Sequence, residues 1–205
     1  MKKWVITIVI LGIIGFIGFL IVSWGIGVNN NMVEMQGEAE KKWANVESAY
    51  QRRADLIGNL VKTVQGAADF EKSTLTEVIN ARAKATSVTI DPSNLTAASI
   101  AQFQQAQTGL SGALSKLLVA VERYPDLKAS QNFLELQSQL EGTENRINVA
   151  RDRYNTAAGG YNIYLKKIPQ RLITWVGGFE GLPLYEAKEG SDEAPEVEFD
   201  FNKKD

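Results

Sequence analysis

The sequence contains no cysteine and no histidine among its 205 residues. Without cysteine the chain can form no disulfide, and cysteine nucleophiles are excluded. Without histidine it lacks the commonest general acid–base and the commonest zinc ligand, so no metal site is expected. The formal net charge of −2 supplies no basic stripe for nucleic acid. Gly177-Gly178 lacks the lysine of a phosphate-binding loop, so we expect no nucleotide and no cofactor.

One long uncharged run opens the chain, from Trp4 to Val22. A bilayer core needs about 20 such residues. Residues 1–28 are therefore predicted to be a transmembrane anchor that contacts the lipid bilayer through residues 4–22. A core helix of a soluble fold would need a polar face for water, which this run lacks. A cleaved signal peptide is the other alternative, although its apolar stretch is shorter, about 7–15 residues, and Trp24 suits an aromatic anchor among headgroups.

The basic residues around this run are distributed unevenly. Lys2 and Lys3 precede it, and no basic residue follows until Lys41 and Lys42. The positive-inside rule places the N-terminus in the cytoplasm and exports the body. We expect a single-pass protein of the bacterial inner (cytoplasmic) membrane whose body is periplasmic or extracellular.

Beyond the anchor, apolar residues recur at alternating steps of three and four, which is the pattern of a helix. The pattern extends from Met32 to Ala67, from Ile100 to Val121 and from Phe133 to Ile168. A sustained seven-residue repeat predicts shallow left-handed packing of long helices, so the fold class is all-α with a helical bundle over residues 29–185. The glycines and asparagines of residues 25–31 are poor helix formers. We expect a joint there, with a continuous helix as the alternative.

Capping residues and prolines give the expected helix ends. A shorter helix starts with the capping box Thr74-Leu75-Thr76-Glu77, and Gly66 to Ser73 is either a turn or a bend in one long helix. Ser93, in the turn Asp91-Pro92-Ser93, is the expected N-cap of the helix that contains Ile100. Pro125 and Pro169 are expected to end the second and third long segments, because the residue before proline is disfavoured in a helix.

The C-terminal part of the chain has two distinct segments. Residues 171–176 (Arg-Leu-Ile-Thr-Trp-Val) form a short apolar segment that we expect to fold back on the bundle; the alternative is a second element that touches the membrane. From Glu186 onward the chain is acidic and aperiodic, which predicts a flexible tail over residues 186–205. Within it, Val197 to Phe201 alternates apolar and acidic residues. Such a pattern can add a strand to a partner's sheet edge, and a disordered end is the alternative.

A set of charged residues lies at or near the apolar faces of the predicted helices: Arg53, Asp55, Glu71, Arg82, Glu122, Glu144 and Arg151. A buried arginine needs a partner because its desolvation costs several kcal/mol. We therefore predict a structural ion-pair network in which Arg53 pairs with Glu122 or Glu144. A carboxylate acid–base pair for hydrolysis, drawn from Glu71, Glu122 and Glu144, is the alternative, and it requires a concave pocket and shifted pKa values.

Two Tyr-Asn pairs, Tyr154-Asn155 and Tyr161-Asn162, lie one heptad apart in the third long segment. Tyrosines on a bundle face are usually core residues whose hydroxyl groups reach the rim. An exposed ladder of tyrosines would instead indicate a protein interface. These four residues are therefore the candidate interface.

Several stretches in order resemble the LemA family. Tyr50 to Val64 (YQRRADLIGNLVKTV) resembles its central motif. The further matches are Phe70-Glu71, Ala81-Arg82, Glu122 to Ala129, Phe133 to Leu140, Thr143-Glu144, Ala150 to Asn155, Tyr161-Asn162, Gly178-Phe179 and Tyr185-Glu186-Ala187. The sequence departs from the family at Gly58, where proline is usual, and at Tyr185, where phenylalanine is usual. Without proline at 58, the first helix is expected to run straighter than in relatives.

The resemblance implies a single-pass membrane protein with an antiparallel bundle similar to a four-helix arrangement, and it implies no enzymatic activity. We expect a membrane-anchored, non-catalytic scaffold or adaptor for other proteins or for its own oligomers. A tether raises the effective concentration of neighbours, so homo-oligomerisation is expected, and the protein partner is unspecified. The alternative function is lipid binding or membrane remodelling through the outer face of the bundle, with Trp43, Trp175 or residues 171–176 inserting.

Overall fold

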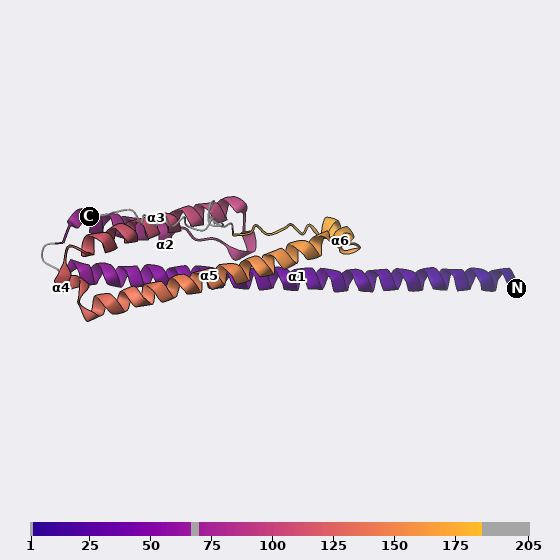
Figure 1. Cartoon of the computed structure of the whole chain (residues 1–205). Coiled ribbons are helices and arrows are strands. Elements are labelled where there is room, and N and C mark those ends of the chain that lie inside the picture. Colours follow the sequence, from indigo (N-terminus) through magenta and orange to yellow (C-terminus); the bar gives the residue numbers. More distant parts are fainter. Residues whose placement is uncertain (1, 67–69, 186–205) are drawn as a thin grey trace, which may run out of the picture.

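The computed structural model describes residues 2–66 and 70–185, and the predicted tail at 186–205 lies outside them. Within the described residues all regular structure is helical, which confirms the all-α prediction (Figure 1). The elements in order are α1 (Lys2–Gln65), α2 (Lys72–Ser87), the 3-10 helix η1 (Pro92–Asn94), α3 (Ala97–Val121), α4 (Pro125–Lys128), α5 (Gln131–Lys166) and α6 (Gln170–Gly177).

The first helix, α1, is 64 residues long and runs unbroken through residues 25–31, so the expected joint is wrong and the continuous helix is right. Glycine and asparagine each disfavour a helix by no more than about 1 kcal/mol. Packing offsets this cost: Val28 and Met32 are buried against Tyr161 and Leu165 of α5. Tertiary contacts therefore extend the rigid helix from the apolar run into the body.

The N-terminal part of α1 projects beyond every other described element (Figure 1). All side chains from Trp4 to Val22 are exposed. This is the one described helix long and apolar enough to cross a membrane, with a mean hydropathy of 3.1 over its most apolar stretch. At 1.5 Å per residue the run is about 28 Å long, which matches a hydrocarbon core of about 30 Å.

The body consists of α1 with α5 running back along it, and of α2 and α3 packed on one side of that pair (Figure 1). Its core consists of three clusters that follow one another along α1. At the end remote from the apolar run, Leu60 lies with Leu117 of α3 and Phe133 of α5, and at the near end Met32 lies with Tyr161. Side chains of this size contribute about 1.5–3 kcal/mol each when fully buried.

The middle of the core is aromatic. Trp43 is completely buried, and its ring lies 5.6 Å from Phe103 and 5.2 Å from Tyr154, both in edge-on geometry. Trp43 therefore cannot insert into lipid as the alternative function supposed, since it fills the junction of α1, α3 and α5. Trp175 on α6 is 88% exposed, which is the opposite environment.

The starts of α2 and α3 differ from those predicted. Glu71 occupies the N-cap position of α2, and Thr74 Oγ1 donates to the Glu71 carboxylate at 3.3 Å, so the capping box at Thr74 is wrong. Thr96 caps α3 by accepting from Ser99 N at 3.1 Å, so Ser93 is not the cap. Serine, threonine and acidic residues follow one another closely in both connections. Since each of them can cap a helix, packing of the helix decides which one does.

The predicted prolines lie after the helix ends rather than at them. α3 ends at Val121 and α5 at Lys166, whereas Pro125 opens the single turn of α4. Proline suits the first turn of a helix because its missing N–H would have no partner there. Between α1 and α2 the helix stops at Gln65 and the chain reverses, which makes this connection a turn rather than a bend, with residues 67–69 outside the described part.

Candidate functional site

Arg53 is the most buried charged residue in the described structure, with 4% of its surface exposed. Its Nη1 donates to Glu144 Oε2 and to Ser111 Oγ, both at 3.2 Å. Its Nη2 donates to the backbone oxygen of Gln107 at 3.2 Å and to Gln107 Oε1 at 2.9 Å. Of the two partners predicted for this arginine, the structure brings Glu144 to it. The guanidinium thus ties α1 to both α3 and α5.

The remaining charged residues do not join this cluster. Each forms its own contact, so one connected network is replaced by separate pairs: Arg82 with Asp55 (3.4 Å), Arg123 with Glu71 (3.0 Å), and Lys128 with Glu122. The side chains of the three candidate acid–base glutamates are about half exposed, and each faces a different cation. No two of them line one pocket among those found in the described residues.

Arg151, which is half-buried, lies against the buried Tyr50 and Tyr185. Its Nη2 donates to the Tyr50 hydroxyl, its guanidinium lies 4.3 Å from the Tyr185 ring centroid, and the two tyrosine oxygens are 2.8 Å apart. The guanidinium carbon of Arg53 lies 4.9 Å from the ring centroid of Tyr50. Cation–π contacts of this kind strengthen when desolvated. The two arginines therefore hold one aromatic core from both ends, a structural role.

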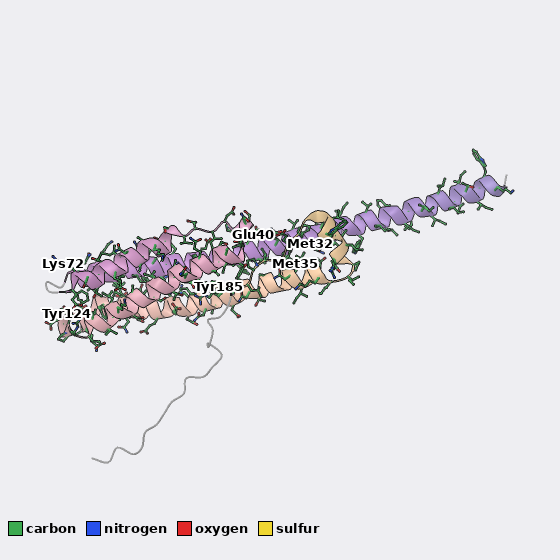
Figure 2. The ribbon with its side chains drawn as sticks, turned by 90° about the horizontal axis from the view of Figure 1, so that it is seen from above. Met32, Met35, Glu40, Lys72, Tyr124 and Tyr185 are labelled. Atoms are coloured by element: carbon green, nitrogen blue, oxygen red, sulfur yellow. The ribbon has the colours of Figure 1, made fainter. Side chains whose placement is uncertain are left out.

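The predicted Tyr-Asn pairs hold the end of the chain. The strap, residues 178–185, runs back along α5, and Tyr185 lies beside that helix (Figure 2). Asn162 donates to the Leu182 oxygen and accepts from the Leu182 N–H, both at 2.8 Å. Asn155 does the same with Tyr185, at 2.8 and 2.7 Å. Each asparagine amide thus pairs with both backbone groups of one strap residue.

The tyrosines of these pairs are in the core, as the first interpretation of the sequence expected. Tyr154 is fully buried and donates to the Pro183 oxygen at 2.6 Å, and Tyr161 is 1% exposed. The strap itself was missed by the sequence interpretation. The available signal was an asparagine, a poor helix former, repeated one heptad apart at the edge of an otherwise apolar seam.

Burial of Tyr154 predicts a pH dependence of stability. Burial raises the pKa of Tyr154 to about 12, and burial raises the pKa of Tyr185 as well. Unfolded tyrosines lose their protons near pH 10, so above that pH the unfolded state binds fewer protons than the folded state. The free energy of unfolding should therefore fall between about pH 10 and pH 12, by up to about 1.4 kcal/mol per pH unit for each tyrosine.

Tyr154→Phe should make this decline shallower, while costing about 1 kcal/mol at neutral pH through the lost bond to Pro183. The measurement is chemical unfolding of the full chain in detergent across the alkaline range. Lysine titration is common to both proteins and cancels in the comparison. An unchanged slope in the variant would contradict the assignment.

A groove runs along the outer side of the α1–α5 pair, with a volume of about 890 Å³. Val149 and Leu56 form part of its wall, and the rest is mostly polar. The charged residues that line it are Lys42, Arg52, Arg146, Arg153 and Asp55. Lys42 is engaged with Glu38 at 2.7 Å, whereas Arg52, Arg146 and Arg153 are exposed. The groove is therefore a basic, open surface suited to an acidic extended segment.

A family model described as the LemA family matches residues 42–199. That range is most of the chain, and it includes the groove, Arg53, Arg151 and the strap. The chain belongs to the LemA family. Magnetosome protein MamQ 2 of Paramagnetospirillum magneticum is 26% identical over 205 residues, which cover 91% of this chain and 73% of that protein.

Two further relatives agree. Magnetosome protein MamQ of Magnetospirillum gryphiswaldense is also 26% identical over 91% of the chain and 73% of its own length. Protein LemA of Metamycoplasma hominis is 26% identical over 72% of the chain and 66% of its own length. Together with the exposed apolar run of α1, membership of the LemA family makes this chain a membrane-associated helical protein.

Proposed function

We propose that this LemA-family protein is a membrane-tethered, non-catalytic scaffold that assembles with copies of itself. In this proposal the groove between α1 and α5 binds the acidic residues 186–205 of a neighbouring copy. The groove carries the proposal, because it presents Arg52, Arg146 and Arg153 outward on the rigid pair that is continuous with the membrane anchor.

Charge complementarity within one chain supports this occupant. Residues 186–205 contain eight acidic residues against three lysines. They follow directly on Tyr185, which Asn155 holds on the same helix as Arg153. Twenty residues span at most about 70 Å, which is long enough to reach another copy. Two copies anchored in one membrane meet at a raised effective concentration.

The remaining parts of the proposal concern chemistry and topology. A non-catalytic role is supported by the lack of histidine and cysteine in the sequence and by the separate cation partners of Glu71, Glu122 and Glu144. We place the anchor in the bacterial inner membrane with Lys2 and Lys3 in the cytoplasm, and the body as an antiparallel four-helix bundle of α1, α2, α3 and α5. Because the chain has no cysteine, labelling of a Val119→Cys variant, at an exposed position outside the groove, by an impermeant maleimide in spheroplasts tests the side of the body.

Reversing the groove charges should abolish self-association. In the variant R52E/R146E/R153E, the acidic segment would meet three like charges instead of three opposite ones. The measurement is photo-crosslinking of the full chain in detergent, with a benzoylphenylalanine at Val149 in the groove and mass spectrometry to locate the product. A mixture of isotopically heavy and light chains separates products between copies from products within one copy. We expect links from Val149 to residues 186–205 of another copy, lost in the variant and weakened by salt.

A matched control changes the same charge elsewhere. K62E/K72E/K84E alters three exposed lysines that do not line the groove and should leave the crosslinks intact. A chain lacking residues 186–205 should fail to assemble with itself. It should form crosslinks with R52E/R146E/R153E, because the truncated chain supplies the groove and the variant supplies the acidic segment. A single monomeric species at all concentrations, or links only within one copy, would refute the proposal.

A further inference from the structure

The helix α6 exposes three large apolar side chains on one stripe. Leu172 is 67% exposed, Trp175 88% and Val176 77%, and Ile168, just before the helix, is 85% exposed. The spacing of three and four residues from Leu172 places Trp175 and Val176 on the same side of the helix. No described residue covers this side. An isolated exposed leucine needs no explanation, but a contiguous apolar stripe with a tryptophan does.

The position of α6 relates this stripe to the membrane anchor. A Cβ atom at Gly25 would lie 3.5 Å from Ile173 Cδ1, so α6 packs on α1 at that glycine. Gly25 lies three residues beyond Val22, about 4.5 Å further along the helix. Figure 2 shows α6 beside Met32 and Met35, crossing the direction of α1 rather than following it. A helix in this place lies in the plane of the membrane surface if α1 spans the bilayer.

The rotation of α6 turns the stripe away from the body. Thr174 Oγ1 lies 4.0 Å from Met32 Sδ, on the body side, whereas Ile173 contacts Gly25, nearer the anchor. Successive helical residues are about 100° apart, so Val176 lies about 60° from Ile173 on the side away from Thr174. Leu172 lies on that side as well. The stripe therefore extends from the anchor side to the outside of the molecule.

Basic residues flank the stripe. Lys166, Lys167 and Arg171 are all exposed, and Arg171 faces the cavity shared with Thr96 and Glu180 on the body side. Apolar side chains toward the lipid with basic side chains above them are the arrangement of an interfacial helix, which lies about 5–10 Å deep at the boundary between headgroups and acyl chains. Tryptophan is the residue favoured at that depth.

We infer that α6 is a second membrane contact, an interfacial helix that lies in the leaflet from which the body emerges. Its apolar stripe enters the acyl boundary, and Lys166, Lys167 and Arg171 contact anionic headgroups. Together with the span, it fixes the body at two points, so the body stands at a defined angle and rotation to the membrane. The inference does not depend on the proposed self-association.

Single cysteines test this inference directly, because the chain has none of its own. Val176→Cys, labelled with an environment-sensitive fluorophore, is reconstituted in vesicles of phosphatidylcholine. The expected result is a blue-shifted emission that spin-labelled lipid quenches. The control is Val119→Cys on α3, where the native valine is 71% exposed and remote from the anchor; it should show neither effect.

Varying the headgroup charge separates the contribution of the apolar stripe from that of the basic side chains. In vesicles with equal parts of phosphatidylcholine and phosphatidylglycerol, the Val176 label should shift further to the blue, and K166Q/K167Q/R171Q should remove that additional shift alone. Equal spectra for the Val176 and Val119 labels would overturn the inference. A blue shift without quenching by lipid would overturn it too, since protein would then cover the stripe.

Discussion

Replacing Arg53 by alanine is expected to lower the free energy of unfolding by about 3–5 kcal/mol. The substitution leaves Gln107 Oε1 without its 2.9 Å donor in a residue that is 5% exposed. An unsatisfied buried acceptor costs about 1–3 kcal/mol. The lost methylene groups of the arginine add about 0.8 kcal/mol each. Glu144 adds little to the loss, because its side chain is 52% exposed and water can replace the guanidinium.

Three further variants separate these contributions. E144Q keeps the shape and removes the charge, and should cost at most about 1 kcal/mol. R53M keeps the stem and loses only the polar contacts. R53M/Q107L also removes the orphaned Oε1 acceptor, together with the 3.3 Å bond from Gln107 Nε2 to the Ala85 oxygen, so it should return to within about 2 kcal/mol of the parent. The measurement is denaturant unfolding of each full chain in the same detergent. A double variant as unstable as R53A would show that the charge, rather than satisfied polar contacts, stabilises this core.

The apolar periodicity of the sequence was sufficient to predict the helices and most of the core of this protein. Trp43, Val46, Tyr50, Ile57 and Leu60, all taken from one stripe of the first segment, are at most 1% exposed. The prediction of buried residues succeeds because the spacing of apolar residues along one helix decides which face is buried. The same stripe is covered whichever helix packs against it. The apolar pattern also predicted that Met32 would be buried, and it is. The low helix propensity of the neighbouring glycine and asparagine residues instead suggested a joint, which α1 does not have.

The partners across helices could not be predicted in the same way. Spacing places Arg53, Glu122 and Glu144 near inner faces, but the choice of partner depends on the offset between helices. That offset is set by packing and by the lengths of the connections. Glu122 follows the end of α3 and pairs with Lys128, six residues later at the end of α4, so the contact is local in sequence. The strap was hidden for another reason: residues 178–185 have no period, and only their partners on α5 do.

Gly58 leaves room on α1 for an arginine of α2. Arg82 Nε donates to the Ala54 oxygen at 2.7 Å, and in a helix that oxygen also accepts from the N–H of residue 58. A Cβ at position 58 would lie only 3.1 Å from Arg82 Nε. In this chain the arginine keeps its contact and glycine leaves room for it.

Replacing Tyr185 by alanine is expected to release the strap from α5, with a loss of about 3–5 kcal/mol in the free energy that holds it. Tyr185 is 7% exposed and contributes its ring to Arg151, its hydroxyl to Tyr50 and its backbone to Asn155. Alanine keeps only the last of these. Because the strap lies at the end of the described body, the loss should appear first as local opening rather than as global unfolding.

Hydrogen exchange measures that opening at two amides, since the N–H groups of Leu182 and Tyr185 are held by Asn162 and Asn155. Both should exchange faster in Y185A, by about two to four orders of magnitude for 3–5 kcal/mol, while buried amides of α1 near Ile57 change little. Y185F retains the ring and loses only the hydroxyl contact, about 1 kcal/mol. N162A should free Leu182 more than Tyr185. If the Leu182 and Tyr185 amides exchanged at the same rate in Y185A and Y185F, the Tyr185 ring would not hold the strap on α5. The asparagine amides alone would then be enough to hold it.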